Sequence, residues 1–117
     1  MTKLTAQDLP TETASLREIQ EYVRKMAIQR RHSQDIPVEM MYLTEEIGEL
    51  AKALREHIGG DFDAQTSHKD LREEFEDCFY NLLNLANLTE VDLFDAMIEK
   101  EKINLSRNWK KLETEVK

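Results

Sequence analysis

Two stretches of the chain repeat one pattern of apolar and acidic residues at a constant offset of 28 positions. "LTEEIGELAKAL" begins at Leu43 and "LREEFEDCFYNL" begins at Leu71. Each stretch has apolar residues at helical spacing and one acidic pair whose members are three residues apart. The pairs are Glu46 with Glu49 and Glu74 with Asp77. At about 100° per residue, both pairs lie on the same border of their apolar stripe. The pattern predicts two amphipathic helices with equivalent acidic borders.

A short polar stretch from Gly59 to Ser67 separates these helices. It predicts an antiparallel hairpin in which the two apolar stripes face each other. In an antiparallel pair, matching borders lie on the same side of the seam. The acidic pairs are centred about 11 residues before the loop and about 8 after it, so at roughly 1.5 Å per residue their heights differ by about 5 Å. We therefore expect four carboxylates to converge.

Such a cluster needs something that offsets its charge. Two carboxylates about 6 Å apart repel by roughly 3 kcal/mol at an effective dielectric constant of 20. Protonation or a bound cation relieves this repulsion. Oxygen ligands suit Mg²⁺, Mn²⁺ or Ca²⁺, and Mg²⁺ commonly adds waters and substrate phosphates. A solvated acidic surface is the alternative, because Glu-x-x-Glu spacing is common in charged helices.

The rest of the chain predicts an all-α protein with four helices. Glycine and proline are scarce, at three and two residues in 117, which favours a few long helices over a sheet. We expect a flexible lead at 1–12, a helical domain at 13–110 and a polar tail at 111–117. The predicted helices cover about 13–31, 36–58, 67–88 and 89–110, and the last three begin at the capping residues Asp35, Ser67 and Thr89. The residues expected to face the core are Leu16, Ile19, Val23, Met26, Ala27, Leu43, Ile47, Leu50, Leu54, Leu71, Phe75, Cys78, Leu82, Leu85, Ala86, Val91, Phe94, Ile98 and Leu105, with Trp109 as a packing anchor.

Composition narrows the classes of function. The net charge is −8 and there is no basic run, which argues against nucleic-acid binding. No apolar run reaches the roughly 20 residues that span a membrane, and the N-terminus lacks the apolar core of a signal peptide. The single cysteine, Cys78, excludes an internal disulfide and fits a reducing compartment. We expect a cytoplasmic protein.

A weaker group of polar residues lies on one face of the last predicted helix, away from its stripe. The group is Lys100, Asn104 and Arg107. These side chains suit phosphate and base contacts, but a solvated face explains them equally well. Asn81 lies one turn after Asp77 on the acidic border, where it could reach a ligand, but a generic polar flank explains it equally well.

The motifs "EIGE" (46–49) and "EFED" (74–77) resemble a known signature, Glu-x-x-Glu on one helix and Glu-x-x-Asp on the next. With "LTEEIGELAKAL", "LREEFEDCFYNLLNLA" and "KINLSRNW", the stretch from about Glu39 to Trp109 resembles the MazG-like group of the all-α nucleoside triphosphate pyrophosphohydrolases. Glu76 departs from the small residue often found before the Asp, which crowds that turn.

The resemblance implies hydrolysis of a nucleoside or deoxynucleoside triphosphate between the α- and β-phosphates, giving monophosphate and pyrophosphate. It implies that Glu46, Glu49, Glu74 and Asp77 bind Mg²⁺, or Mn²⁺, and perform the catalysis. Asn81, Lys100, Asn104 and Arg107 become candidate substrate-binding residues. The resemblance further implies a four-helix bundle completed by formation of a homodimer or homotetramer, and a role in cleaning the nucleotide pool.

Two other functions fit parts of the pattern. A ferritin-like di-iron bundle also binds metal through helical carboxylates, but it needs two Glu-x-x-His motifs, and no histidine here follows a Glu by three residues. A non-catalytic helical oligomerisation or adaptor protein with an acidic surface explains the stripes but leaves the matched acids without a role.

Overall fold

The computed structural model describes the backbone of residues 2–59 and 64–116, and the side chains of residues 2–59 and 70–107. The elements are a short 3₁₀ turn, η1 (Ala6–Asp8), and the helices α1 (Leu16–Gln29), α2 (Ile36–Gly59), α3 (Ala64–Leu88) and α4 (Leu93–Val116). The described residues contain no strand, which confirms the all-α prediction. Residues 60–63 of the predicted loop and the Trp109 side chain lie outside the described residues.

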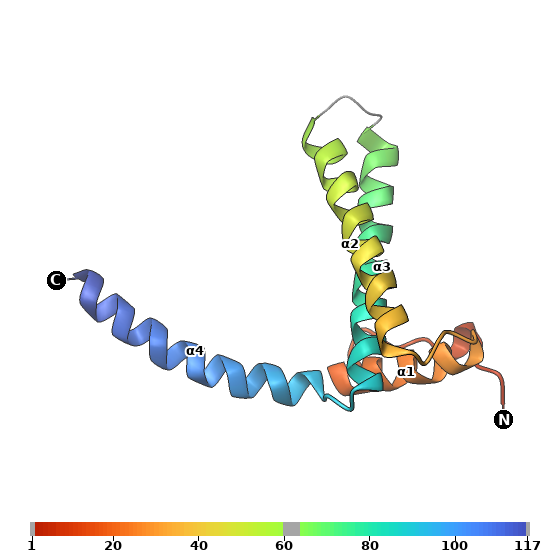
Figure 1. Ribbon diagram of the computed structural model, residues 1–117, viewed down its shortest axis with the longest axis horizontal. Coiled ribbons are helices and arrows are strands. Elements are labelled where there is room, and N and C mark those ends of the chain that lie inside the picture. Colours follow the sequence, from red (N-terminus) through yellow and green to blue (C-terminus); the bar gives the residue numbers. More distant parts are fainter. Residues whose placement is uncertain (1, 60–63, 117) are drawn as a thin grey trace.

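The α2 and α3 helices lie side by side and run in opposite directions (Figure 1). The buried apolar residues of the pair are Leu43 and Ala53 of α2 and Leu71, Leu83 and Ala86 of α3, and Leu83 has no exposed surface. Leu43, Leu71 and Ala86 belong to the predicted stripes. The predicted antiparallel hairpin is therefore confirmed, and it fixes the relative positions of the two acidic borders.

The α1 helix crosses the base of the hairpin, at the end away from the α2–α3 loop (Figure 1). It begins at the N-cap Ser15, whose side chain forms a capping box with Glu18. Val23, Met26 and Ala27 are buried, as the sequence predicted. The lead is attached to this helix, because the Leu4 amide donates to Gln29 Oε1 at 2.7 Å and Gln29 Nε2 donates to the Leu4 carbonyl at 3.2 Å.

One of the three predicted caps is confirmed and two are wrong. Asp35 caps α2, since its Oδ1 accepts from the Val38 amide at 3.1 Å. The α3 helix already begins at Ala64, so Ser67 lies inside it. Thr89 belongs to the end of α3, where its Oγ1 donates to the Leu85 carbonyl at 2.8 Å.

The residue that caps α4 is Asp92, whose Oδ1 accepts from the Asp95 amide at 3.0 Å. Between Thr89 and Asp92 the chain turns through Glu90, which has a positive φ of 59°. The turn needs these extra residues, and Thr89 therefore cannot start the next helix.

The α4 helix leaves the base of the hairpin and points away from α2 and α3 (Figure 1). Arg17 of α1 holds its start through an ion pair to Asp92 (Nε to Oδ2, 2.7 Å) and another to Asp95. The α4 helix continues to Val116, through the predicted polar tail.

This direction leaves the α4 stripe uncovered in a single chain, where Leu105 is 67% exposed. Other residues expected in the core are also exposed, namely Ile47, Phe75, Leu82, Val91, Phe94 and Ile98. That part of the prediction is wrong for the single chain, because α1 covers only one end of the hairpin. The α4 helix covers none of it.

A buried amide joins the turn before α4 to α1. Gln20 Nε2 donates to the Val91 carbonyl at 2.6 Å, and the Leu93 amide donates to Gln20 Oε1 at 3.2 Å. Asn87 Nδ2 also donates to the Gln20 carbonyl at 2.9 Å. These bonds satisfy backbone groups on both sides of the turn, and together with the Arg17 ion pairs they tie the start of α4 to α1.

Candidate metal centre and adjoining pocket

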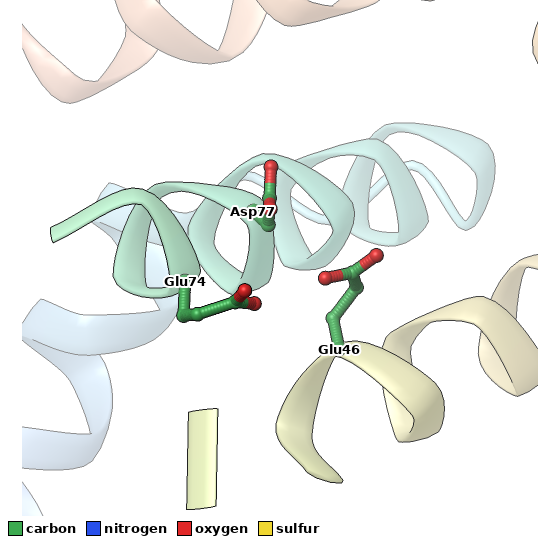
Figure 2. Close-up of side chains that lie close together, drawn as sticks. All are labelled: Glu46, Glu74 and Asp77. Carbon is green, nitrogen blue, oxygen red and sulfur yellow. The ribbon is translucent and has the colours of Figure 1, made fainter. Parts of the chain in front are cut away.

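Three of the four predicted acids meet at the hairpin seam. Glu46 of α2 reaches toward Glu74 and Asp77 of α3, and one carboxylate oxygen from each lies within 4.8 Å of the others (Figure 2). Ligand oxygens bound to one Mg²⁺ at about 2.1 Å are at most about 4.2 Å apart, so a small side-chain adjustment closes the set around one ion. Glu49 is exposed and lies outside this group.

The electrostatics of the cluster favour a cation. Burial raises the pKa of Glu46, and repulsion from Asp77 and Glu74 raises it further. Burial also raises the pKa of Glu74, and Asp77 and Glu49 add to the effect. The negative charge of Glu49 therefore contributes to the raised pKa of both Glu46 and Glu74, although Glu49 lies outside the group of three acids. Like charges this close oppose ionisation, and a divalent cation reverses that preference.

Hydrogen bonding within the cluster points the same way. Glu74 Oε2 is buried and has no hydrogen-bond partner among the residues that the structure describes. A buried carboxylate oxygen without a partner is unfavourable, and a metal ion supplies the missing interaction. With an all-oxygen ligand set, the residues present fit Mg²⁺ or Mn²⁺.

A pocket of about 370 Å³ adjoins the acids. Glu46 and Asp77 form the wall that it shares with the cluster. The other residues that line it are Arg30, His32, Glu39, Tyr42, Glu76, Tyr80 and Asn81. The structure thus brings the predicted residue Asn81 to the same cavity as the acids.

Tyr80 is held in the pocket wall by two neighbours from the end of α1. The Arg30 guanidinium carbon lies 5.3 Å from the centre of the Tyr80 ring, and the His32 ring meets it edge-on at 5.6 Å. Burial raises the pKa of the Tyr80 hydroxyl, and the neighbouring Arg30 guanidinium opposes this rise. Arg30 also places a positive charge beside the carboxylates, where a phosphate group would need one.

Glu39 is the most buried acidic residue among those that line the pocket. It is 2% exposed, and its Oε2 accepts from Asn84 Nδ2 at 3.2 Å. Its other oxygen, Oε1, is buried without a hydrogen-bond partner in the described part of the chain.

Within one chain, the predicted group on α4 does not join this site. Lys100 and Arg107 are exposed, and neither they nor Asn104 belong to the described lining of the pocket. The helix that carries them points away from the hairpin (Figure 1).

Sequence reasoning did not assign six of the residues that line the pocket to the site, namely Arg30, His32, Glu39, Tyr42, Glu76 and Tyr80. Glu39 carries a usable signal, because it stands seven residues before Glu46 and so lies on the same helical border two turns earlier. Arg30 carries none, since only the packing of α1 across the hairpin brings it there.

Comparison with known families agrees with this geometry. The model of the MazG nucleotide pyrophosphohydrolase domain matches residues 34–105, which are 72 of the 117 residues and include both acidic pairs. The chain belongs to the MazG nucleotide pyrophosphohydrolase domain family. No curated protein matches it. The MazG match begins at residue 34, after Arg30 and His32 of the pocket. Among the described residues, no helix combines the length and the hydropathy that a membrane span requires.

Proposed function

We propose that this protein hydrolyses nucleoside or deoxynucleoside triphosphates to the monophosphate and pyrophosphate with Mg²⁺, for which Mn²⁺ can substitute. The observation that carries the proposal is the meeting of Glu46, Glu74 and Asp77 within 4.8 Å. Membership of the MazG family supplies the reaction class, a nucleotide pyrophosphohydrolase. The pocket beside the acids supplies room for the rest of the nucleotide.

We assign a separate role to each residue of the site. Glu46, Glu74 and Asp77 hold the metal, together with Glu49 from the margin. When bound, Mg²⁺ neutralises charge on the triphosphate and increases the acidity of a coordinated water. One of the four carboxylates accepts the proton of the attacking water. Arg30 binds phosphate oxygens through its planar donors, and Asn81 contacts the sugar or the base.

We further propose that the protein forms a homodimer or homotetramer. The exposed stripe of α4 supports this, because a helix with one uncovered apolar face is stabilised by a partner surface. In such an assembly Lys100, Asn104 and Arg107 reach the pocket of a neighbouring chain. This arrangement gives the α4 group a role although it stays away from the acids of its own chain.

The proposed role is the cleaning of the nucleotide pool in the cytoplasm. Conversion of a triphosphate to a monophosphate removes it from the substrates of polymerases. The single cysteine fits a reducing compartment.

The test is an assay of products from a panel of canonical and modified nucleoside triphosphates with Mg²⁺. Release of pyrophosphate and monophosphate, abolished by a chelator and by Asp77→Asn, supports the proposal. Release of inorganic phosphate and the nucleoside diphosphate would mean that the bond between the β- and γ-phosphates is cleaved instead. A protein that neither binds metal in a titration nor releases pyrophosphate fits the adaptor alternative.

A further inference from the structure

The buried carboxylate of Glu39 has no role in the metal site. It lines the pocket, yet it precedes Glu46 by seven residues, or about 10 Å along α2. A ligand that reaches from the metal site to Glu39 is longer than a single phosphate group. Because a carboxylate repels phosphate, a different chemical group of the ligand must lie at Glu39. This conclusion rests on the proposed function, in which the phosphates lie at the acids.

The Asn84 side chain fixes the orientation of that carboxylate. Asn84 is itself 2% exposed and donates to Glu39 Oε2. Oε1 then remains as an acceptor that finds no donor among the described side chains. Because burial without a donor is costly for a carboxylate oxygen, a ligand that donates a hydrogen bond at this point gains affinity.

The same pocket offers flat surfaces and a second polar atom. Tyr42 and Tyr80 line it, and aromatic rings suit the face of a nucleobase. Tyr80 Oη is also buried and makes no hydrogen bond of ordinary geometry in the described residues, although the Arg30 guanidinium interacts with it, and a hydroxyl can donate as well as accept. Stacking accepts any base, so the polar atoms decide which base binds best.

We propose that Glu39 selects nucleotides whose base carries an exocyclic amino group. An ionised carboxylate can only accept hydrogen bonds. Cytosine, adenine and guanine present an amino donor, and carboxylates accept from the cytosine amino group in DNA recognition. Uracil, thymine and hypoxanthine present a carbonyl oxygen or a hydrogen atom at the corresponding positions. A carbonyl oxygen repels the carboxylate, and a hydrogen atom leaves it without a donor.

The experiment compares kcat/KM for pyrophosphate release within three matched pairs: dCTP with dUTP, dATP with dITP, and dGTP with dITP. In at least one pair the wild-type protein should favour the amino-bearing member by on the order of 10- to 100-fold. Glu39→Gln should bring that ratio close to one, mainly by raising KM for the amino-bearing member, because the amide also offers a donor. Glu56→Gln makes the same change on the same helix outside the pocket and should keep the wild-type ratio.

A binding measurement separates this inference from the proposed function. Calorimetric titration with dCMP and dUMP, or with the monophosphates of the pair that discriminates best, reads the base without requiring turnover. A preference that depends on Glu39, in a protein that releases no pyrophosphate, would refute the proposed function and support base selection. Pyrophosphate release with equal kcat/KM in every pair, or with uracil preferred, would leave the activity standing and overturn the inference.

Two further outcomes decide the role of Glu39 itself. Unchanged ratios in a folded Glu39→Gln protein, or equal loss in Glu56→Gln, overturn the assignment. Where circular dichroism shows that Glu39→Gln is unfolded, Glu39→Asp takes its place. It keeps the charge but withdraws the oxygens by one methylene, and it should lose the preference in the same way.

Discussion

Glu46 of α2 and Glu74 of α3 bring carboxylate oxygens within 4.8 Å of each other although 28 residues separate them in the chain. The antiparallel hairpin creates this approach, because its apolar seam aligns the two acidic borders. The packing free energy of the seam therefore holds together groups that repel one another. This opposition allows activity, metal binding and stability to be tested separately.

Asp77→Asn should abolish turnover and leave the fold intact. The amide removes one negative charge from the cluster, so the metal-free melting temperature should be unchanged or higher. Pyrophosphate release measures the loss of turnover, and thermal melting without metal measures the stability. Glu49→Gln should have the same two effects. Near-normal activity of either variant with Mg²⁺ would show that the altered residue is not a metal ligand.

Stability without metal should fall as pH rises through the raised pKa of Glu46. The folded chain holds this proton above the ordinary value of 4.5, whereas the unfolded chain has lost it, so ionisation favours unfolding. From about pH 5 to about pH 7.5, the metal-free wild type should therefore lose stability relative to Glu46→Gln, which does not titrate. Thermal melts at both pH values measure this. A difference in melting temperature between wild type and Glu46→Gln that stays constant with pH would contradict this prediction.

Addition of Mg²⁺ should reverse this loss at neutral pH. An ion that binds only the folded state, at about 100 times its Kd, stabilises by about 2.7 kcal/mol. For a chain of this size that corresponds to a rise of roughly 10 °C in melting temperature. Asp77→Asn, in which one carboxylate is lost, should show a clearly smaller rise in the same titration.

The acidic hairpin could be predicted because its causes are local. Helical periodicity places Glu46 and Glu74 on equivalent borders, and a short connection makes the helices antiparallel. The residue at which α4 starts could not be predicted from the sequence, because Thr89 and Asp92 are both good capping residues. The choice depends on the positive φ of Glu90 between them.

Burial was less predictable than periodicity. The apolar positions of Phe75 and Leu105 indicate that these faces favour a partner surface, but periodicity does not say whether the same chain supplies it. Glu39 and Asn84 extend the acidic borders by seven residues each, and their pairing was within reach of the same reasoning. Arg30 joins the pocket only through tertiary packing, for which no local pattern exists.

Leu105→Glu should shift the protein toward a smaller species. Leu105 is 67% exposed in one chain, so a charge there costs little unless another chain covers it. Size-exclusion chromatography with light scattering over a range of concentrations measures the change. The neighbouring exposed residue provides a matched control, Ser106→Glu, which should retain the wild-type mass. Identical masses for wild type and Leu105→Glu would remove α4 from the interface.

Arg107→Ala should raise KM for the nucleotide several-fold, and Asn104→Ala should change the ranking among bases more than the rate on the best one. Where α4 serves a neighbouring chain, a mixture of Asp77→Asn and Arg107→Ala proteins should regain activity, because some sites then combine intact residues from both. The mixture is assayed after subunits have exchanged. Wild-type kinetics for both α4 variants would show that this face is solvated.

The buried amide of Gln20 gives the fold two parts that can change independently. It bonds the turn at Val91 and Leu93, and it lies apart from the acidic borders of the hairpin. A substitution at Gln20 should therefore loosen the attachment of α4, which the ion pairs of Arg17 also hold, while the carboxylates of the candidate metal centre stay in place. In the proposed assembly, a change at this turn would alter how two chains meet and leave the acids of each hairpin as they are.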